Sequence, residues 1–200
     1  MHLTKDNEVV IAHDFDLERV AKLDPSIHGS KKYIGEFDFS ELPQFRAVFQ
    51  SGLTGDCTYR HHEEINTTSY CRLEDLFILC QEPQYQKVLV NIDMKNAPRE
   101  LKENQPGFSE EEAMLLFRRK ISIVKTLIEK YNMIDRVFWV SVFPRECAVL
   151  YEEENSHINR CFAARTIFKM MAMHFLGFLW MYPIRDHHYT VPFISDKAYE

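Results

Sequence analysis

The 200-residue sequence lacks the features that mark several specialised classes of protein. Its five cysteines are odd in number and include no C-x-x-C pair, so they indicate neither a disulfide framework nor a zinc site, and a reducing compartment suits them best. Its 24 basic and 30 acidic residues give a net charge of -6 without a basic stripe, so nucleic acid is not an expected partner. No apolar h-region occurs near the N-terminus, and we expect a protein that is not secreted.

What the sequence does contain is typical of a globular domain, with 46% hydrophobic residues. Short apolar runs predict strands over residues 8–12, 87–94, 137–142 and 160–163. Helices are expected over residues 73–80, 109–131 and 144–154, the second beginning at a capping box formed by Ser109 and Glu112. Most of residues 24–70 is expected to form a long polar loop. The alternation of strand and helix predicts parallel strands in an α/β sheet or barrel.

The most apolar part of the chain is residues 170–184, which at about fifteen residues are too few to span a bilayer as a helix. A buried core helix is the favoured interpretation, and an exposed surface that binds lipid or a partner is the alternative. In the exposed case Phe178, Trp180 and Tyr182 would contact the membrane, because aromatic residues of this kind suit its interface.

Polar residues suited to catalysis or to ligand binding lie at the ends of two of the expected strands. Alternation along N-I-D-M-K places Asp93 and Lys95 on one face, where Asp93 can bind a hard divalent cation and Lys95 can neutralise a phosphate oxygen. A solvated strand face with an ordinary Asp/Lys pair is an equal alternative. His13 ends the first strand and can exchange a proton near neutral pH, although a capping histidine also fits that position.

The sequence resembles the glycerophosphodiester phosphodiesterase family in the order and spacing of three segments. They are T-K-D-N-E-V-V-I-A-H-D-F-D-L-E-R (residues 4–19), C-R-L-E-D-L-F (71–77) and V-N-I-D-M-K (90–95). A fourth segment, G-F-L-W-M-Y-P-I-R-D (177–186), is similar to the membrane-associated branch that acts as lysophospholipase D.

This resemblance implies a (β/α)8 TIM barrel of the PLC-like phosphodiesterase type that hydrolyses glycerophosphodiesters or lysophospholipids with a divalent cation, calcium or magnesium. His13 matches one of the two catalytic histidines, Asp93 matches a metal-ligand carboxylate, and Lys95 matches the lysine that faces the substrate phosphate. The resemblance also implies association with a membrane, on its cytoplasmic side.

The sequence departs from the family pattern ahead of His13, where the H-R-G and E-x-D motifs do not occur, and Val20-Ala21 replaces an expected T-T-G. We therefore expect residues 1–200 to be an incomplete domain, a partial barrel with about four of eight strands. A lone carboxylate holds calcium or magnesium poorly, so we expect weak cation binding and an inactive chain. The alternatives are a non-catalytic remnant that binds lipid or a full-length relative, and an unrelated α/β interaction protein.

Three other motifs are interpreted as incidental. Glu36-Phe37-Asp38 is an E-x-D in the wrong place, and Arg60-His61-His62-Glu63-Glu64 lacks the histidine spacing of a zinc site and suits a solvated loop. His187-His188 also lacks that spacing, because neighbours on a strand face opposite ways.

Overall fold

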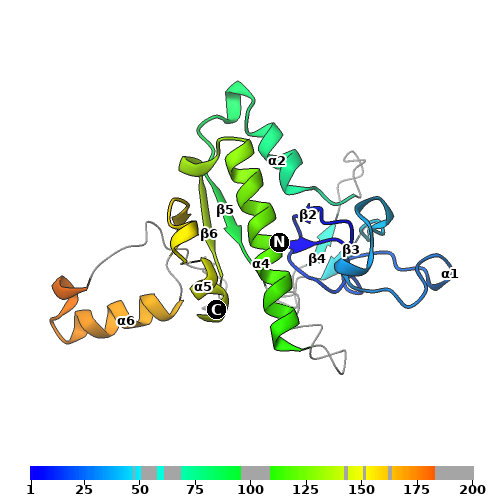
Figure 1. Cartoon of the computed structure of the whole chain (residues 1–200). Helices are drawn as coiled ribbons and strands as arrows, with labels where there is room; N and C mark the ends of the chain where they lie inside the picture. The colour runs from blue at the N-terminus through cyan, green and yellow to red at the C-terminus, as the bar shows by residue number, and fades with distance from the viewer. Residues whose placement is uncertain are drawn as a thin grey trace. The chain divides into compact units, whose positions relative to one another are not determined.

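The computed structural model describes residues 1–46, 48–50, 58–60, 69–95, 109–141, 144–150, 152–161 and 164–182 (Figure 1). The chain divides into two compact units, which are described one at a time below. The first comprises Met1–Gln86 and Lys95–Tyr131, and the second comprises Lys87–Met94 and Asn132–Glu200. Among the described helices, none combines the length and the apolar character needed to cross a bilayer.

The first unit begins with a small antiparallel pair of strands, β1 (His2–Leu3) and β2 (Val9–Val10). Asn7 has a φ of 72° in the turn between them, a left-handed conformation that asparagine tolerates better than most residues. The strand predicted over residues 8–12 is shorter in the structure, where β2 spans only Val9–Val10. Its parallel pairing is a wrong prediction, because the tight turn returns the chain antiparallel to its own start.

The stretch over residues 24–70 contains more structure than the polar loop predicted for it. It holds α1 (Pro25–His28), the 3-10 turns η1 (Ile34–Glu36) and η2 (Phe39–Glu41), and an antiparallel pair, β3 (Val48–Gln50) and β4 (Thr58–Arg60). Its apolar side chains join a buried cluster with residues of the N-terminal segment. That cluster contains Val10, Phe15, Leu17, Val20, Ala21, Tyr33, Ile34, Phe37 and Tyr70. Burial of these side chains holds a segment with little regular structure in place.

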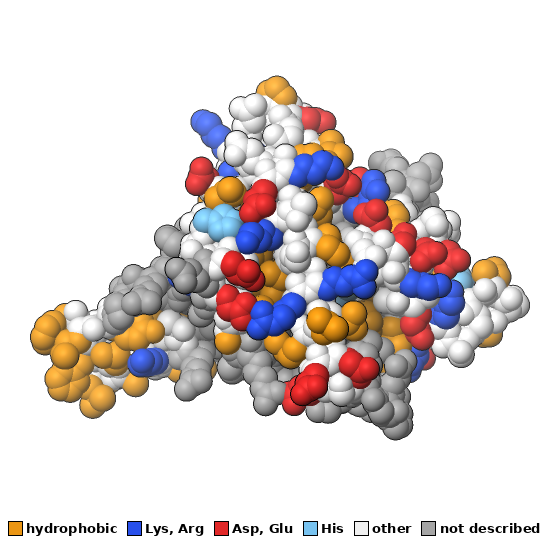
Figure 2. Space-filling view, in the orientation of Figure 1, with side chains coloured by type: hydrophobic (Ala, Val, Ile, Leu, Met, Phe, Trp, Pro, Cys, Tyr) orange, Lys and Arg blue, Asp and Glu red, His pale blue; other side chains and the backbone are white. Residues whose placement is uncertain are grey.

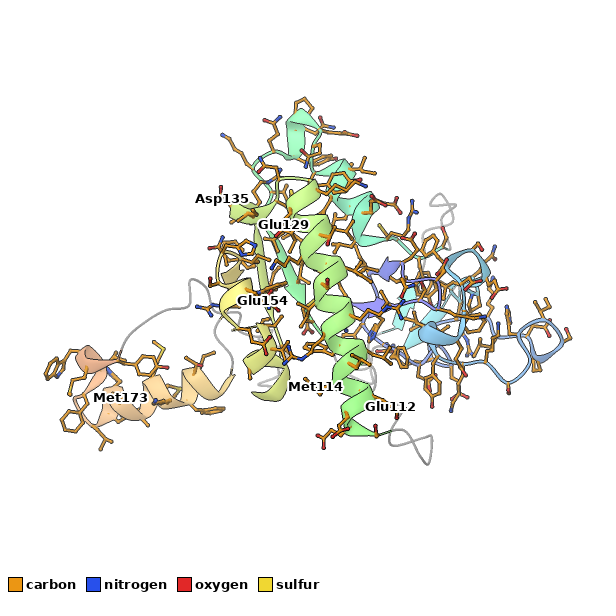
Figure 3. All side chains as sticks on the ribbon, in the orientation of Figure 1. Glu112, Met114, Glu129, Asp135, Glu154 and Met173 are labelled. Carbon is orange, nitrogen blue, oxygen red and sulfur yellow. The ribbon has the colours of Figure 1, made fainter. Side chains whose placement is uncertain are left out.

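Two helices complete the first unit, α2 (Leu73–Leu79) and α4 (Glu110–Lys130), with the 3-10 turn η3 (Pro83–Tyr85) between them. The capping box of α4 is confirmed: Glu112 N donates to Ser109 Oγ over 3.1 Å, and Ser109 N donates to Glu112 Oε2 over 2.8 Å. Figure 3 shows Glu112 near this end of the helix and Glu129 near the other. The buried face consists of Ala113, Phe117, Lys120, Ile121, Val124 and Ile128. Lys120 is the one charged residue on this otherwise apolar face, whereas Leu116 is 37% exposed.

The second unit is built on a parallel sheet in the order β5 (Val90–Asp93), β6 (Val137–Val140) and β7 (Asn159–Arg160). The turn η4 (Ile134–Arg136) precedes β6, while α5 (Pro144–Leu150) and η5 (Glu153–Asn155) lie between β6 and β7. The prediction of an α/β fold with parallel strands is confirmed here. Three parallel strands are present among the described residues, and these three do not close into a barrel.

The second unit also contains α6 (Ala164–Phe175) and η6 (Leu179–Met181), which cover most of the apolar segment predicted over residues 170–184. Most side chains described between residues 166 and 182 are exposed rather than buried. The favoured interpretation of a buried core helix is therefore wrong for these residues, and residues 183 and 184 lie outside the described part of the chain.

Candidate active site

His13 lies just beyond β2. Its backbone is hydrogen-bonded to a buried side chain, while its ring is exposed to solvent. Its side chain is 63% exposed. Its carbonyl oxygen accepts a hydrogen bond of 3.0 Å from Nε2 of His2, a fully buried residue of β1. A substrate can therefore reach the ring, and the buried contact fixes the main chain that carries it.

The His13 ring has a partner on each nitrogen. Nδ1 lies 2.6 Å from Asp14 Oδ1, and Nε2 lies 2.9 Å from Lys95 Nζ. A carboxylate only accepts hydrogen bonds, so in the neutral ring the proton belongs on Nδ1 and the lone pair of Nε2 faces Lys95. The two predicted residues His13 and Lys95, 82 positions apart in the sequence, are thus in direct contact.

Asp14 is itself oriented by Arg19, whose Nε and terminal nitrogen lie 2.7 Å and 2.5 Å from Asp14 Oδ2. Partial burial favours the neutral acid, but the hydrogen bonds from His13 and Arg19 outweigh it and lower the pKa of Asp14. Burial and the negative charge of Asp14 together raise the pKa of Tyr70 far above its ordinary value. Asp14 therefore stays ionised at neutral pH and holds the His13 ring in one tautomer.

Lys95 is anchored through its backbone by a buried lysine of α4. Lys120, whose exposed fraction is 3%, donates from Nζ to the carbonyl oxygen of Lys95 and, over 3.2 Å, to that of Met1. Its ammonium also lies 5.2 Å from the centroid of the Phe117 ring. These contacts replace the water that a buried charge loses, and they fix the chain at the residue that reaches His13.

Sequence reasoning did not identify His2 or Lys120. Burial lowers the pKa of His2 well below 6.5, and the positive charges of the N-terminal amine, Lys120 and Lys95 add to that effect. The signal for Lys120 was its place between Phe117 and Val124 on the apolar face of the helix. For His2 the sequence offers no comparable signal, since its burial depends on contacts with residues far along the chain.

Asp93 is the last residue of β5, in the second unit, where it pairs in register with Val140 of β6. Ile92 and Met94 are fully buried, whereas Asn91 is exposed and Asp93 is half-buried. The predicted alternation of the N-I-D-M-K strand is thus confirmed. The role of Asp93 as a metal ligand stays a prediction.

No group of three or more His, Cys, Asp or Glu side chains that could hold a metal ion occurs among the described residues. Calcium and magnesium need several oxygen ligands at fixed positions, so the carboxylate of Asp93 does not make such a site by itself. In the Glu36-Phe37-Asp38 motif, Glu36 Oε2 accepts hydrogen bonds of 2.9 Å from the backbone nitrogens of Lys32 and Tyr33, which is a capping role. Residues 61–64, 187 and 188 lie outside the described part of the chain.

The arrangement suits proton transfer beside an anionic group. Nε2 of His13 can accept a proton from a nucleophile or, once protonated, return it to a leaving oxygen. Lys95 presents a compact positive charge at the same atom, which suits a phosphate oxygen. Asp14 and Arg19 hold the ring in the orientation that this exchange requires.

Comparison with known proteins agrees with this chemistry. The model of the glycerophosphoryl diester phosphodiesterase family matches residues 1–176, a range that includes His13, Asp14, Asp93, Lys95 and Lys120. No curated protein matches the chain. The match also excludes the interpretation of an unrelated α/β interaction protein, and the chain belongs to the glycerophosphoryl diester phosphodiesterase family.

Proposed function

We propose that this protein hydrolyses phosphoric diesters of the lysophospholipid class, with His13 transferring the proton and Lys95 binding the phosphate. The observation that supports this most is the 2.9 Å contact between His13 Nε2 and Lys95 Nζ, in a chain of the phosphodiesterase family. In the absence of substrate the ammonium occupies the position in front of the imidazole lone pair. When a phosphate oxygen of the substrate binds the ammonium of Lys95 instead, Nε2 of His13 becomes available to accept a proton.

The proposal extends to the cofactor and the fold. Asp93 is the carboxylate that we propose as one ligand of a calcium or magnesium ion. The steps assigned to His13 and Lys95 do not pass through that ion. We further propose that the parallel strands β5, β6 and β7 belong to a partial TIM barrel, the architecture implied by the family.

A lysophospholipid substrate places the protein at a membrane, and we propose the cytoplasmic face of one. The exposed side chains of Phe178 and Trp180 and the half-buried Tyr182 support this location, because they gather aromatic groups that suit the lipid interface. Free glycerophosphodiesters share the same phosphate chemistry and serve as the soluble comparison in the experiments below.

The direct test is release of choline or ethanolamine from lysophospholipids, measured with calcium or magnesium present. If the chain is active, His13→Ala should lower the rate by about 10²- to 10⁴-fold, because the proton-transfer group is lost. Asp14→Asn should also lower it, since the ring then loses its fixed tautomer. His157→Ala is the matched control, because this exposed histidine lies in the second unit, and its replacement should leave the rate unchanged.

Release that persists in His13→Ala would overturn the assignment of that residue. Binding of lysophospholipid with no release under any of these conditions would support the alternative, a non-catalytic protein that binds lipid or a full-length relative. Release of choline or ethanolamine by the wild type would also contradict the expectation that the 200-residue chain is inactive.

A further inference from the structure

The helix α6 presents an apolar stripe to solvent. Phe168, Met171, Ala172 and Phe175 occupy positions i, i+3, i+4 and i+7, which lie on one face of a helix, and all four are exposed. The exposed fraction is 70% for Phe168 and 80% for Phe175. Figure 2 shows hydrophobic side chains gathered over this segment. The face that an amphipathic helix normally buries is here turned outward.

The stripe continues beyond the end of the helix. Gly177 has a φ of 76°, and hydrogen bonds from its own nitrogen to His174 O and from Phe178 N to Met173 O end the helix in a tight reversal. Phe178 and Trp180 follow this bend, and Trp180 is 81% exposed. A single exposed apolar residue is ordinary, but a contiguous set of this size is typical of a surface that binds lipid or another molecule.

The charges of the segment indicate what binds there. Residues 164–182 contain no Asp or Glu, although the whole chain has a net charge of -6. Lys169 is a basic residue of the helix, and its Nζ lies 5.2 Å from the centroid of the Tyr182 ring. An apolar face that carries Lys169 and aromatic rings beside it, and no acidic residue, is complementary to the headgroup region of an anionic bilayer.

We propose that α6 and η6 form an interfacial anchor for membranes that contain anionic lipid, with the stripe against the acyl chains and Lys169 at the phosphate groups. The helix is too short to span, so it lies along the surface. This inference deepens the proposed function, on which it rests for the lipid nature of the substrate. Its test requires neither substrate nor catalysis, so it can fail separately.

The experiment is co-sedimentation of the full chain with vesicles of phosphatidylcholine, with and without phosphatidylserine, in buffer without added divalent cation. The wild type should bind the anionic vesicles more strongly. The double variant Phe168→Ser with Phe175→Ser should bind at least roughly tenfold more weakly to both kinds, because two aromatic side chains no longer enter the interface. Lys169→Gln should weaken binding to the anionic vesicles alone, by roughly fivefold.

Leu115→Ser is the matched control, since Leu115 is an equally exposed apolar residue of α4 and should not affect vesicle binding. Trp180 fluorescence gives a second measurement: it should shift to shorter wavelength on binding, and Trp180→Phe should abolish the shift, because Trp139 is already buried. Circular dichroism of each variant confirms that it is folded. Binding unchanged in the double variant, or a dimer in solution that hides Trp180 from vesicles, would overturn the proposal.

Discussion

At the scale of single residues, His2 is a buried imidazole, and the folded state disfavours its protonation. Burial, the N-terminal amine and two lysines lower the pKa of His2 well below 6.5. The unfolded chain takes up this proton near pH 6.5 whereas the folded chain does not. The contribution of neutral His2 to the free energy of unfolding is therefore complete above pH 6.5, and it is lost as the pH falls toward the lower pKa of the folded state.

We predict that His2→Gln removes this part of the pH dependence, because glutamine can still donate to the His13 carbonyl but does not titrate. Below pH 6.5 the free energy of unfolding of the wild type should fall faster than that of the variant, by at most about 1.4 kcal/mol per pH unit. Urea unfolding at pH values on both sides of 6.5 measures the difference. Identical slopes for the two proteins would show that His2 does not couple folding to pH.

The sequence predicted which side chains of the β5 strand are buried, because a two-residue alternation is a local property. It also identified His13 and Lys95, through their positions at the ends of strands and through the family motifs. It did not reveal their contact through Nε2, nor the support from His2 and Lys120. Those contacts join residues 11 to 82 positions apart, and no local pattern encodes them.

At the scale of elements, the end of α6 depends on a glycine. Gly177 adopts a φ of 76°, and an added Cβ would meet no atom within 4 Å, so the residue is required by the backbone conformation and not by space. This bend determines where Phe178 and Trp180 emerge from the helix.

We predict that Gly177→Ala destabilises the end of α6 by about 1 kcal/mol, because a Cβ disfavours the left-handed conformation. Gly177→Asn should cost less, since asparagine tolerates this conformation. Chemical denaturation monitored by Trp180 fluorescence and by circular dichroism measures both variants. Equal stability of the glycine and alanine proteins would mean that the bend does not need its positive φ.

The capping box of α4 is a local motif that determines where the helix begins, and Ser109 caps the helix as the sequence predicts. Ser109→Ala should lower the free energy of unfolding by about 1 kcal/mol, because an N-terminal backbone donor loses its side-chain acceptor. Ser122→Ala, an exposed change within the same helix, should be close to neutral. A cost for Ser109→Ala no larger than that control would contradict the capping role.

The short elements between residues 24 and 70 could not be predicted in this way. The strands β3 and β4 form by pairing with one another, and Phe45 bridges back to Ala21. Such pairing depends on where the chain returns, whereas a helix depends on neighbours within a few positions. The exposure of α6 has a similar explanation: its 3.6-residue pattern defines an apolar face but not whether that face is covered.

At the scale of the whole molecule, the account depends on one site in the first unit and one surface in the second. The site holds His13 and Lys95 in contact within a chain of the phosphodiesterase family. The surface consists of α6 and η6. We propose that the site binds a lysophospholipid and that the surface binds an anionic bilayer. Each can be tested by binding alone, which separates recognition from the rate of hydrolysis.

The most direct test of the central claim is calorimetric titration of the full chain with glycerophosphocholine, a soluble phosphodiester. If Lys95 binds the phosphate, Lys95→Met should weaken binding by at least about tenfold, because a charged hydrogen bond is lost. Lys22→Met, which removes an exposed lysine elsewhere in the same unit, should bind as the wild type does. Equal affinity of the wild type and Lys95→Met would contradict the proposed site.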